Sequence, residues 1–295
     1  MILNKSPHTY LILSIFFCLL LYPSYLFSHQ EKRYERVIEI RQGDIYYLTL
    51  SVKAMPISVT GYLKNREISF FKTSKDNLYG ALIGVDLAEE KDKYDFDIKI
   101  VYKDRSNKTR HYQIKVLPVK FKVQELTLPK DKVDLDEKSL KRVMNEQKRV
   151  KLIWKRHVDT RLWNGSFIRP VEGDIMKSFG SRRIINGQKR NPHTGEDFRA
   201  DFGTEVHVSN DGIVSMADDL FFSGKSVIID HGAGLFTMYF HLSKVNVREG
   251  DRVKKGSVIG LVGATGRVTG PHLHWGVRLH GARVNPVSIT NINME

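Results

Sequence analysis

The last third of the chain constrains the fold most, because glycine residues there divide the sequence into short apolar runs. From Asn164 onward, segments such as Ser226–Asp230 and Ser257–Gly263 are rich in β-branched and other apolar side chains and are bounded by Gly or Asp. Runs of this length are typical of buried strands, and no apolar periodicity of helix length remains. We therefore expect an all-β domain with tight turns over residues 164–295.

The first half of the chain predicts a separate small β-sandwich over residues 30–120. Ile45–Leu50 is a strand candidate, and Tyr94–Ile100 alternates apolar and polar residues as a half-buried strand does. Lys103–Asn107 is turn material, and His111–Val116 is the expected hairpin partner. Short strands at this spacing favour an immunoglobulin-like sandwich. The region has no catalytic cluster, so we expect a spacer or a docking domain for envelope proteins.

Residues 121–163 predict a helical connector between these two domains. Asp134 or Asp136 is placed to cap a helix, and the positions between the apolar residues are dense in Lys, Arg and Glu. The apolar residues that recur at near-helical spacing are Leu140, Val143, Met144, Val150 and Trp154.

Residues 1–28 resemble an export signal. Lys5 precedes an apolar run from Tyr10 to Leu21, which is shorter than the roughly 20 apolar residues of a membrane span. A cleaved signal peptide is the preferred interpretation, and a membrane anchor that tethers the chain is the alternative. Both place the rest of the chain in the periplasm or cell envelope, or outside the cell. The single cysteine, Cys18, lies in this segment, so the remainder forms no internal disulfide.

The formal net charge of +14 favours an anionic partner. The basic residues are spread along the chain, and no helix-turn-helix, zinc-finger or ribonucleoprotein signature accompanies them. An acidic cell-wall polymer or a membrane therefore fits an exported chain better than nucleic acid does.

The candidate chemistry lies in three histidine-containing fragments of the β domain, residues 191–197, 237–242 and 270–276, and the middle one contains His241. His272 and His274 are two residues apart in a strand-like segment, so both rings project from one face. His193 and Asp197 are separated by three residues that include Gly195, which we expect to let the chain fold back. Two histidines and one carboxylate form a three-ligand set for catalytic zinc, which leaves one position open. Spacing alone leaves ordinary surface histidines as the alternative.

The order of motifs in this domain resembles the lysostaphin-type zinc metallopeptidases, which cleave peptidoglycan and have a compact β-sheet catalytic domain. The resemblance covers roughly residues 166–286. The matching stretches are Ser178–Arg182, His193–Asp197, Asp211–Val214, Asp230–Gly232, Tyr239–Leu242, Gly250–Gly256, Gly263–Gly266 and Gly270–His274.

The resemblance implies that His193, Asp197 and His274 bind one zinc ion per chain. It also implies that His241 and His272 handle protons and polarise the scissile carbonyl, since imidazole titrates near neutrality. Glu196 is an alternative base, but in an extended segment it points away from its neighbour Asp197.

Two residues depart from the family pattern. Phe240 stands where a small residue is common, and Glu205 stands where proline is common. Both are expected to affect the shape of the groove, and neither removes a ligand.

Other conspicuous residues of the chain have structural interpretations. Lys254 and Lys255 at a turn are similar to the modified lysine of biotinyl or lipoyl domains, but the doubled lysine and the histidines argue against that role. The histidines for which we expect structural roles are His111, His157, His207, His231 and His280.

The function expected from these features is zinc-dependent hydrolysis of peptide cross-links in bacterial peptidoglycan. The alternatives are a non-catalytic activator of another wall hydrolase and a wall-binding module. A direct D-alanyl–diaminopimelate link is preferred over a glycine bridge, because the N-terminal half is long and not repetitive.

Overall fold

The structure is a computed structural model that describes residues 33–127, 133–156 and 158–294. The signal peptide or anchor expected at residues 1–28 and the expectation for His157 lie outside the described residues. Residues Arg33–Glu295 form one compact unit.

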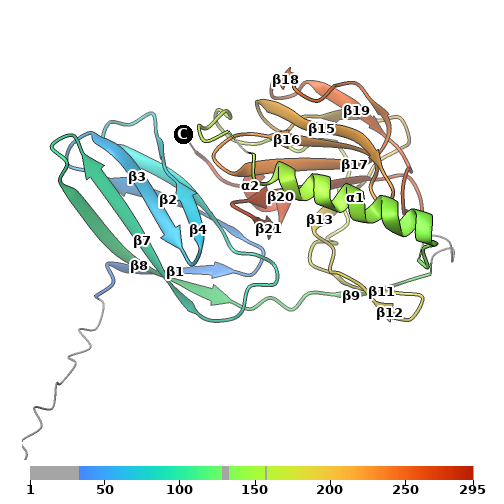
Figure 1. The fold of residues 1–295 in the computed structure, drawn as a ribbon, viewed down its shortest axis with the longest axis horizontal. Helices are drawn as coiled ribbons and strands as arrows, with labels where there is room; N and C mark the ends of the chain where they lie inside the picture. The colour runs from blue at the N-terminus through green and yellow to red at the C-terminus, as the bar shows by residue number, and fades with distance from the viewer. Residues whose placement is uncertain (1–32, 128–132, 157, 295) are drawn as a thin grey trace, which may run out of the picture. The chain divides into compact units, whose positions relative to one another are not determined.

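The N-terminal part is built from two β-sheets (Figure 1). The larger sheet has the strand order β1 (Arg36–Arg41), β8 (Asn107–Leu117), β7 (Lys93–Tyr102), β3 (Pro56–Leu63) and β4 (Arg66–Ser69). The smaller has the order β2 (Ile45–Ser51), β6 (Leu78–Gly84) and β5 (Phe71–Lys72).

Side chains from both sheets form one apolar core. Ile38, Phe96 and Ile114 from the larger sheet are buried with Leu50 and Ile83 from the smaller sheet. The three predicted strands lie within β2, β7 and β8, and β7 and β8 pair antiparallel across the expected turn. The mainly β class is therefore confirmed, while the closer likeness to an immunoglobulin domain stays a prediction.

The connector contains both a strand and a helix. Strand β9 (Val123–Leu126), which the sequence pattern did not predict, precedes helix α1 (Glu137–Ile153). Asp136 caps α1, because its carboxylate accepts a hydrogen bond of 2.7 Å from the Ser139 N–H.

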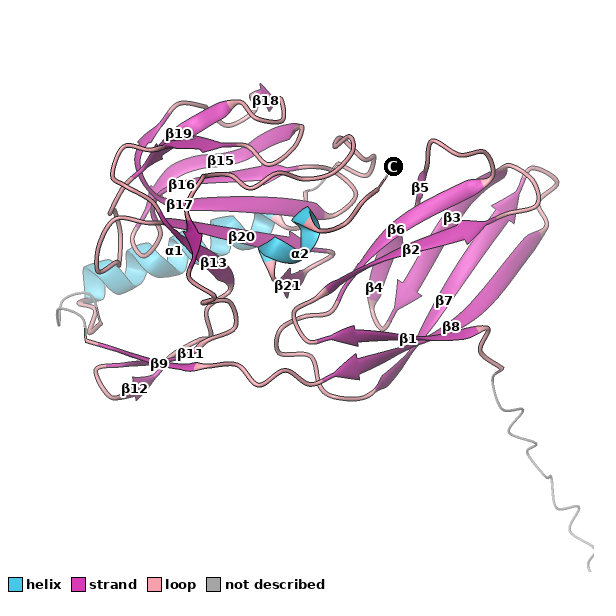
Figure 2. Ribbon diagram, turned by 180° about the vertical axis from the view of Figure 1, so that it is seen from behind, coloured by secondary structure: helices cyan, strands magenta, loops and turns pink. Residues whose placement is uncertain are grey.

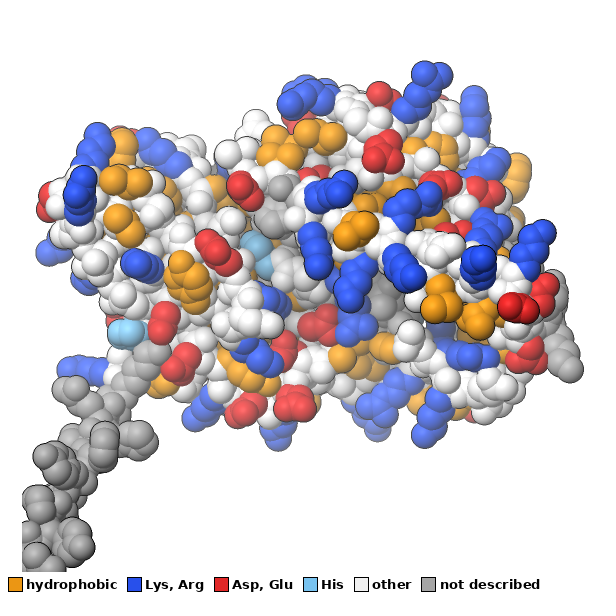
Figure 3. All heavy atoms as spheres, in the orientation of Figure 1, with side chains coloured by type: hydrophobic (Ala, Val, Ile, Leu, Met, Phe, Trp, Pro, Cys, Tyr) orange, Lys and Arg blue, Asp and Glu red, His pale blue; other side chains and the backbone are white. Residues whose placement is uncertain are grey.

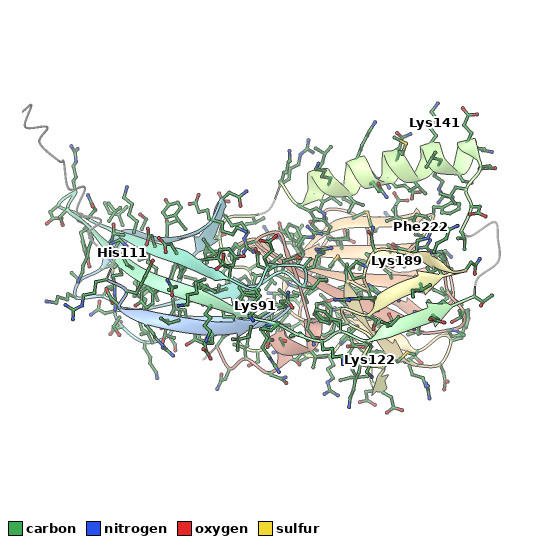
Figure 4. The ribbon with its side chains drawn as sticks, turned by 90° about the horizontal axis from the view of Figure 1, so that it is seen from below. Lys91, His111, Lys122, Lys141, Lys189 and Phe222 are labelled. Carbon is green, nitrogen blue, oxygen red and sulfur yellow. The ribbon has the colours of Figure 1, made fainter. Side chains whose placement is uncertain are left out.

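One face of α1 covers the C-terminal sheet (Figure 2). Val143 is buried, and Val150 and Trp154 pack on apolar side chains of that sheet. Leu140 and Met144 are instead about half exposed, at 49% and 50%. Their spacing fits a helix, but they lie outside its packed stripe. In Figure 4 Lys141 projects from α1 away from the strands.

The C-terminal part is a ten-stranded sheet with a small sheet beside it. Its main path is β10 (Asp174–Ile175), β13 (Gly195–Arg199), β20 (Leu273–Leu279), β17 (Leu235–Val245), β16 (Gly224–Asp230), β15 (Gly212–Leu220) and β18 (Arg252–Val253). Three further strands join it: β14 (Glu205–His207), β19 (Val258–Val262) and β21 (Ala282–Val284).

The small sheet joins the connector to the β domain. It has the strand order β12 (Gln188–Lys189), β11 (Arg182–Ile185) and β9, so a connector strand pairs in parallel with a strand of the C-terminal part. The predicted apolar runs are strands β16 and β19. Among the described residues of 164–295, the exception to the all-β expectation is the short helix α2 (Pro286–Thr290), which Asn285 caps.

Hydrogen bonds and apolar contacts connect residues of the N-terminal sandwich to the end of the chain. Asp86 accepts hydrogen bonds of 2.9 and 2.6 Å from the Arg283 guanidinium and one of 2.8 Å from the Arg283 N–H. Phe71 and Leu82 belong to the same apolar cluster as Trp275 and Leu279. The partly buried ion pair of Asp86 and Arg283 lies next to β20, the strand that carries His274, because Arg283 is on the neighbouring strand β21.

Within the described ranges, neither helix has the length and apolar character of a membrane span.

Because His231 is buried, we predict that the protein loses stability in acid. Burial lowers its pKa to about 4, and its ring nitrogens contact the Asp211 carbonyl at 2.7 Å and the Thr237 hydroxyl at 2.8 Å. The unfolded chain binds this proton near pH 6.5, so the free energy of unfolding should fall by about 3 kcal/mol between pH 6.5 and 4. Urea unfolding at several pH values measures this loss. The variant His231→Gln should show a shallower decline, and an equal decline in both proteins would contradict the assignment.

Candidate metal centre and active site

The pairing of β13 with β20 places two of the predicted metal ligands side by side. These strands are antiparallel, and Asp197 lies directly opposite His274. Side chains of opposite residues in such a ladder share a face and approach closely. The Asp197 Oδ1 and His274 Nδ1 atoms are accordingly 3.0 Å apart.

His193 reaches the same point from the loop before β13. Its Nε2 atom is 2.7 Å from His274 Nδ1 and 3.2 Å from Asp197 Oδ1. The His193 N–H donates to the Ser181 carbonyl at 3.0 Å, and the His193 carbonyl accepts from the Gly180 N–H at 2.8 Å, so both bonds hold the loop. The Nδ1–H group of His193 donates to the Ser178 carbonyl at 3.1 Å. A carbonyl only accepts, so Nε2 keeps its lone pair for a metal.

These three side chains form a group able to hold a metal ion, and all three are buried. Four donors at about 2.1 Å around zinc are separated by roughly 3.3 Å, close to the three distances found here. The donor set of two imidazole nitrogens and one carboxylate oxygen also fits zinc, and it leaves a coordination position free.

The protonation states suit metal binding. Burial alone would raise the pKa of Asp197, but its close contacts with the His193 and His274 rings outweigh burial and hold that pKa well below its usual range. Burial lowers the pKa of His274. An ionised carboxylate and a neutral imidazole are the forms that bind a metal.

Glu196 supports the site from the opposite face of β13. Its buried carboxylate accepts hydrogen bonds of 2.6 and 2.9 Å from the N–H and hydroxyl of Ser178. The Ser178 hydroxyl also accepts a bond of 3.0 Å from the Asp197 N–H, and its carbonyl orients His193. Glu196 therefore positions the loop that carries a ligand.

His241 lies beside the three ligands because β17 is irregular at this point. The register of β17 against β16 shifts near His241, whose φ is 66°. Such bulges redirect a side chain. The ring is 5.0 Å from the His272 ring and 5.9 Å from the His274 ring, between centroids. Burial, followed by the nearby His274 and His272 rings, lowers the pKa of His241 to about 3.

His272 precedes β20 and faces the same centre. Its Nε2 atom is 3.8 Å from Asp197 Oδ1, and its Nδ1–H group donates to the Gly270 carbonyl at 2.9 Å. The corresponding Nδ1–H group of His241 donates to the Thr265 carbonyl at 2.9 Å. The structure therefore brings all five predicted side chains together and leaves the Nε2 atoms of His241 and His272 as proton acceptors.

Gly195 and Phe240 pack against the His274 ring. Gly195 is not among the positive-φ residues, so the expected fold-back is wrong. Its role is close approach, since a Cβ there would lie 2.5 Å from His274 Nε2. Phe240 is opposite His274 across β17 and β20, and their rings stack with centroids 5.4 Å apart. Phe240, which departs from the family pattern, thus supports the metal ligand His274 by stacking on its ring.

Comparison with known proteins identifies this part of the chain. Residues 191–286 match the model of peptidase family M23. The C-terminal part is an M23 peptidase domain. This match spans His193, Asp197, His241, His272 and His274.

Two named relatives match the M23 domain. The peptidoglycan DD-endopeptidase ShyA of Vibrio cholerae is 45% identical over 121 residues, which cover 41% of this chain and 28% of that protein. The DD-carboxypeptidase/endopeptidase Mpg of Neisseria meningitidis is 47% identical over 97 residues, 33% of this chain and 22% of that protein. The matched part spans less than a third of either relative.

A solved structure matches beyond the M23 domain. A crystal structure assigned to peptidase M23, from Pseudomonas aeruginosa, has a TM-score of 0.66 and 27% identity, and covers 84% of this chain and 94% of that one. This likeness extends into the N-terminal half.

The remaining sequence candidates lie apart from the metal donors. His231 is buried between Asp211 and Thr237, and His207 contacts the Gly256 carbonyl. Lys254 pairs with Asp211 at 2.9 Å, and Lys255 donates to the Ser166 carbonyl. Glu205 is exposed on β14. His111, labelled in Figure 4, lies in the N-terminal sandwich. It pairs there with Asp97 at 2.8 Å.

Sequence reasoning missed the residues that support the ligands from outside the histidine motifs. Ser178 and Thr265 were seen only as parts of family motifs, and Arg183 was not singled out. Arg183 lies on β11 with its Nη2 atom 3.7 Å from Asp197 Oδ2. The position of Arg183 could not be predicted, because no local sequence pattern indicates that β11 pairs with β9.

The contact between Gly195 and His274 predicts that Gly195→Ala weakens zinc binding. The added methyl group must displace the His274 ring, and misplacing a ligand typically raises a metal dissociation constant about 10- to 100-fold. Competition with a zinc-selective dye measures it. Gly270→Ala is the control, because a Cβ at Gly270 meets no atom within 4 Å. Equal zinc affinity in Gly195→Ala and the parent would contradict the packing argument.

Proposed function

We propose that this chain is a zinc metalloendopeptidase that hydrolyses peptide cross-links of bacterial peptidoglycan. The observation that carries the proposal is the convergence of His193, Asp197 and His274, with two further histidines beside them. The names of ShyA and Mpg, which match this domain, support a peptide of the cell wall as the substrate.

Three residues hold the metal and two handle protons in this proposal. A zinc ion bound by His193, Asp197 and His274 supplies a Lewis acid that acidifies water and stabilises negative charge on the attacked carbonyl oxygen. His241 and His272 each direct Nδ1–H to a backbone carbonyl, so each offers a bare Nε2 atom. One ring accepts the proton of the attacking water and returns it to the departing amine.

Burial strengthens these interactions. His193, Asp197, His241 and His274 are each at most 9% exposed, and His272 is more accessible. A low-dielectric surrounding increases the effect of each oriented dipole on charge that develops at the substrate. The more exposed His272 is on the side from which a peptide can approach.

The cellular setting follows from the substrate. Peptidoglycan lies outside the cytoplasmic membrane, so we propose export by residues 1–28, as a signal peptide or as a membrane anchor. The N-terminal sandwich then acts as a spacer or as a docking domain for envelope proteins. The net charge of +14 suits an anionic wall, and Figure 3 shows Lys and Arg side chains distributed over the visible face of the C-terminal domain.

Measuring the release of peptides distinguishes the enzyme from two other candidate functions. A non-catalytic activator would release no peptide alone but would stimulate a second hydrolase. A wall-binding module would bind purified walls in the presence of a chelator without releasing fragments. The complete set of five side chains favours the enzyme.

Substitutions at the five residues should separate metal binding from proton transfer. His193→Ala should lose both zinc and the release of peptides from purified peptidoglycan. His241→Ala and His272→Ala should keep one zinc per chain and lower the rate about 10²- to 10⁴-fold, the usual contribution of a general acid or base. Mass spectrometry of released fragments gives the rate, and elemental analysis gives the zinc content.

The control variant is His207→Ala, because His207 lies on β14, where its ring contacts the Gly256 carbonyl and, at 4.0 Å, Glu205. It should retain full activity. Zinc-loaded parent protein that releases no fragment from several wall types would contradict the enzymatic proposal.

A further inference from the structure

A cavity of about 520 Å³ is lined by residues of the N-terminal sandwich, of the connector and of the β11–β12 hairpin. Its volume lies within the range of roughly 300 to 1,000 Å³ that is usual for small-molecule sites. None of the five described side chains of the candidate active site lines it. The cavity is therefore large enough for a small ligand and is separate from the site of the proposed hydrolysis.

Hydrogen bonds hold the walls of this cavity in place. The Gln42 side chain donates to the Glu89 carbonyl at 2.6 Å and accepts from the Val119 N–H at 2.9 Å. It thereby joins the sandwich to the segment that precedes β9. Strand β9 pairs in parallel with β11, which joins the connector to the hairpin. Because the walls are already ordered, a ligand pays less conformational entropy on binding.

One wall of the cavity is cationic. Four residues of the hairpin form it: Arg182, Arg183, Lys189 (labelled in Figure 4) and Arg190. No Asp or Glu is among the described residues that line the cavity. Arg183 lies 3.7 Å from Asp197, but the other three have no salt bridge within the described part of the chain. A hollow lined by charges of one sign attracts ions of the other, so this wall favours an anion.

Two of these arginines have a buried nitrogen atom without a hydrogen-bond acceptor. The Nε atoms of Arg183 and Arg190 are buried, and among the described residues neither has a partner. Arg190 directs its Nη2 atom to Gln188 Oε1 at 2.6 Å, which leaves Nε unsatisfied. A buried donor without an acceptor costs free energy. An oxyanion in the cavity would supply the acceptor that the protein lacks.

The other walls of the cavity are mainly apolar. Their apolar side chains are those of Leu87, Val119, Phe121, Val123 and Ile184. Val123 is 60% exposed although it lies on β9. A small inorganic anion has no group that could cover these side chains, whereas an alkyl chain would remove them from water. A cationic wall facing apolar walls is therefore complementary to an anion that has an apolar body.

We propose that this cavity binds an anionic single-chain lipid. The charged head lies against Arg182, Lys189 and Arg190, and the alkyl chain lies against the apolar walls. Guanidinium and ammonium groups bind both carboxylate and phosphate oxygens, so the shared chemistry of the head group is an oxyanion. Its source is a fatty acid or a lipid phosphate, which two ligands of equal chain length distinguish.

Calorimetry on the zinc-loaded full chain tests the proposal with four small probes. Octanoate should bind about 10- to 100-fold more tightly than neutral octanamide, the range of a charge-assisted hydrogen bond. It should also bind more tightly than acetate, which has the charge but no alkyl chain. Octyl phosphate is the second head group, and the tighter of octanoate and octyl phosphate identifies the source. Equal affinity for octanoate and octanamide, or for octanoate and acetate, would overturn the proposal.

Variants locate the binding site. The double variant Lys189→Gln/Arg190→Gln should bind octanoate about 10- to 100-fold more weakly than the parent and octanamide equally well. The matched control is Arg252→Gln, which removes an exposed arginine on β18 and should bind all four probes as the parent does. Equal urea midpoints and zinc contents exclude a change in folding. Unchanged affinity for octanoate in the double variant would overturn the proposal.

Discussion

The ladder between β13 and β20 is the interaction on which the metal centre depends. It places Asp197 opposite His274, and the next strand, β17, adds Phe240 on the other side of His274. A slip of one residue in either pairing would turn the donors to the opposite face of the sheet. The buried apolar side chains of β17 and β20, including Tyr239 and Trp275, oppose such a slip, because it would move them out of the core. The geometry of the centre is thus a consequence of how the sheet buries its apolar face.

Backbone carbonyls orient three of the histidine rings that the strands bring to the metal centre. The carbonyls of Ser178, Thr265 and Gly270 each accept a hydrogen bond from one imidazole, at 3.1, 2.9 and 2.9 Å, and this selects the tautomer that leaves Nε2 bare. None of these carbonyls depends on the identity of its own side chain. The loops that supply them are held by other contacts, such as the Glu196 carboxylate on Ser178 and the Thr265 hydroxyl on the Leu242 carbonyl. Residues that touch neither metal nor substrate therefore determine the chemical state of the histidines.

The sequence predicted what local patterns encode and missed what long-range pairing creates. The strands around Ile45, Tyr94, His111, Ser226 and Ser257, and the cap at Asp136, follow from alternation, apolar runs and a short polar side chain. The spacing of two positions from His272 to His274 was enough to predict a shared face. By contrast, β9 is short and its parallel partner β11 is distant in the chain, so no local signal reveals it. The packing role of Gly195 and the stacking of Phe240 on His274 also depend on strands that only the fold brings together.

The central claim is that one divalent ion is held by donors from the loop before β13, from β13 and from β20. Anomalous diffraction at the zinc edge, from crystals of the zinc-loaded full chain, tests it most directly. The account predicts one strong peak at about 2.0 to 2.2 Å from His193 Nε2, Asp197 Oδ1 and His274 Nδ1. A peak coordinated by other side chains, or the three donors turned away from one another around no ion in zinc-saturated crystals, would contradict it.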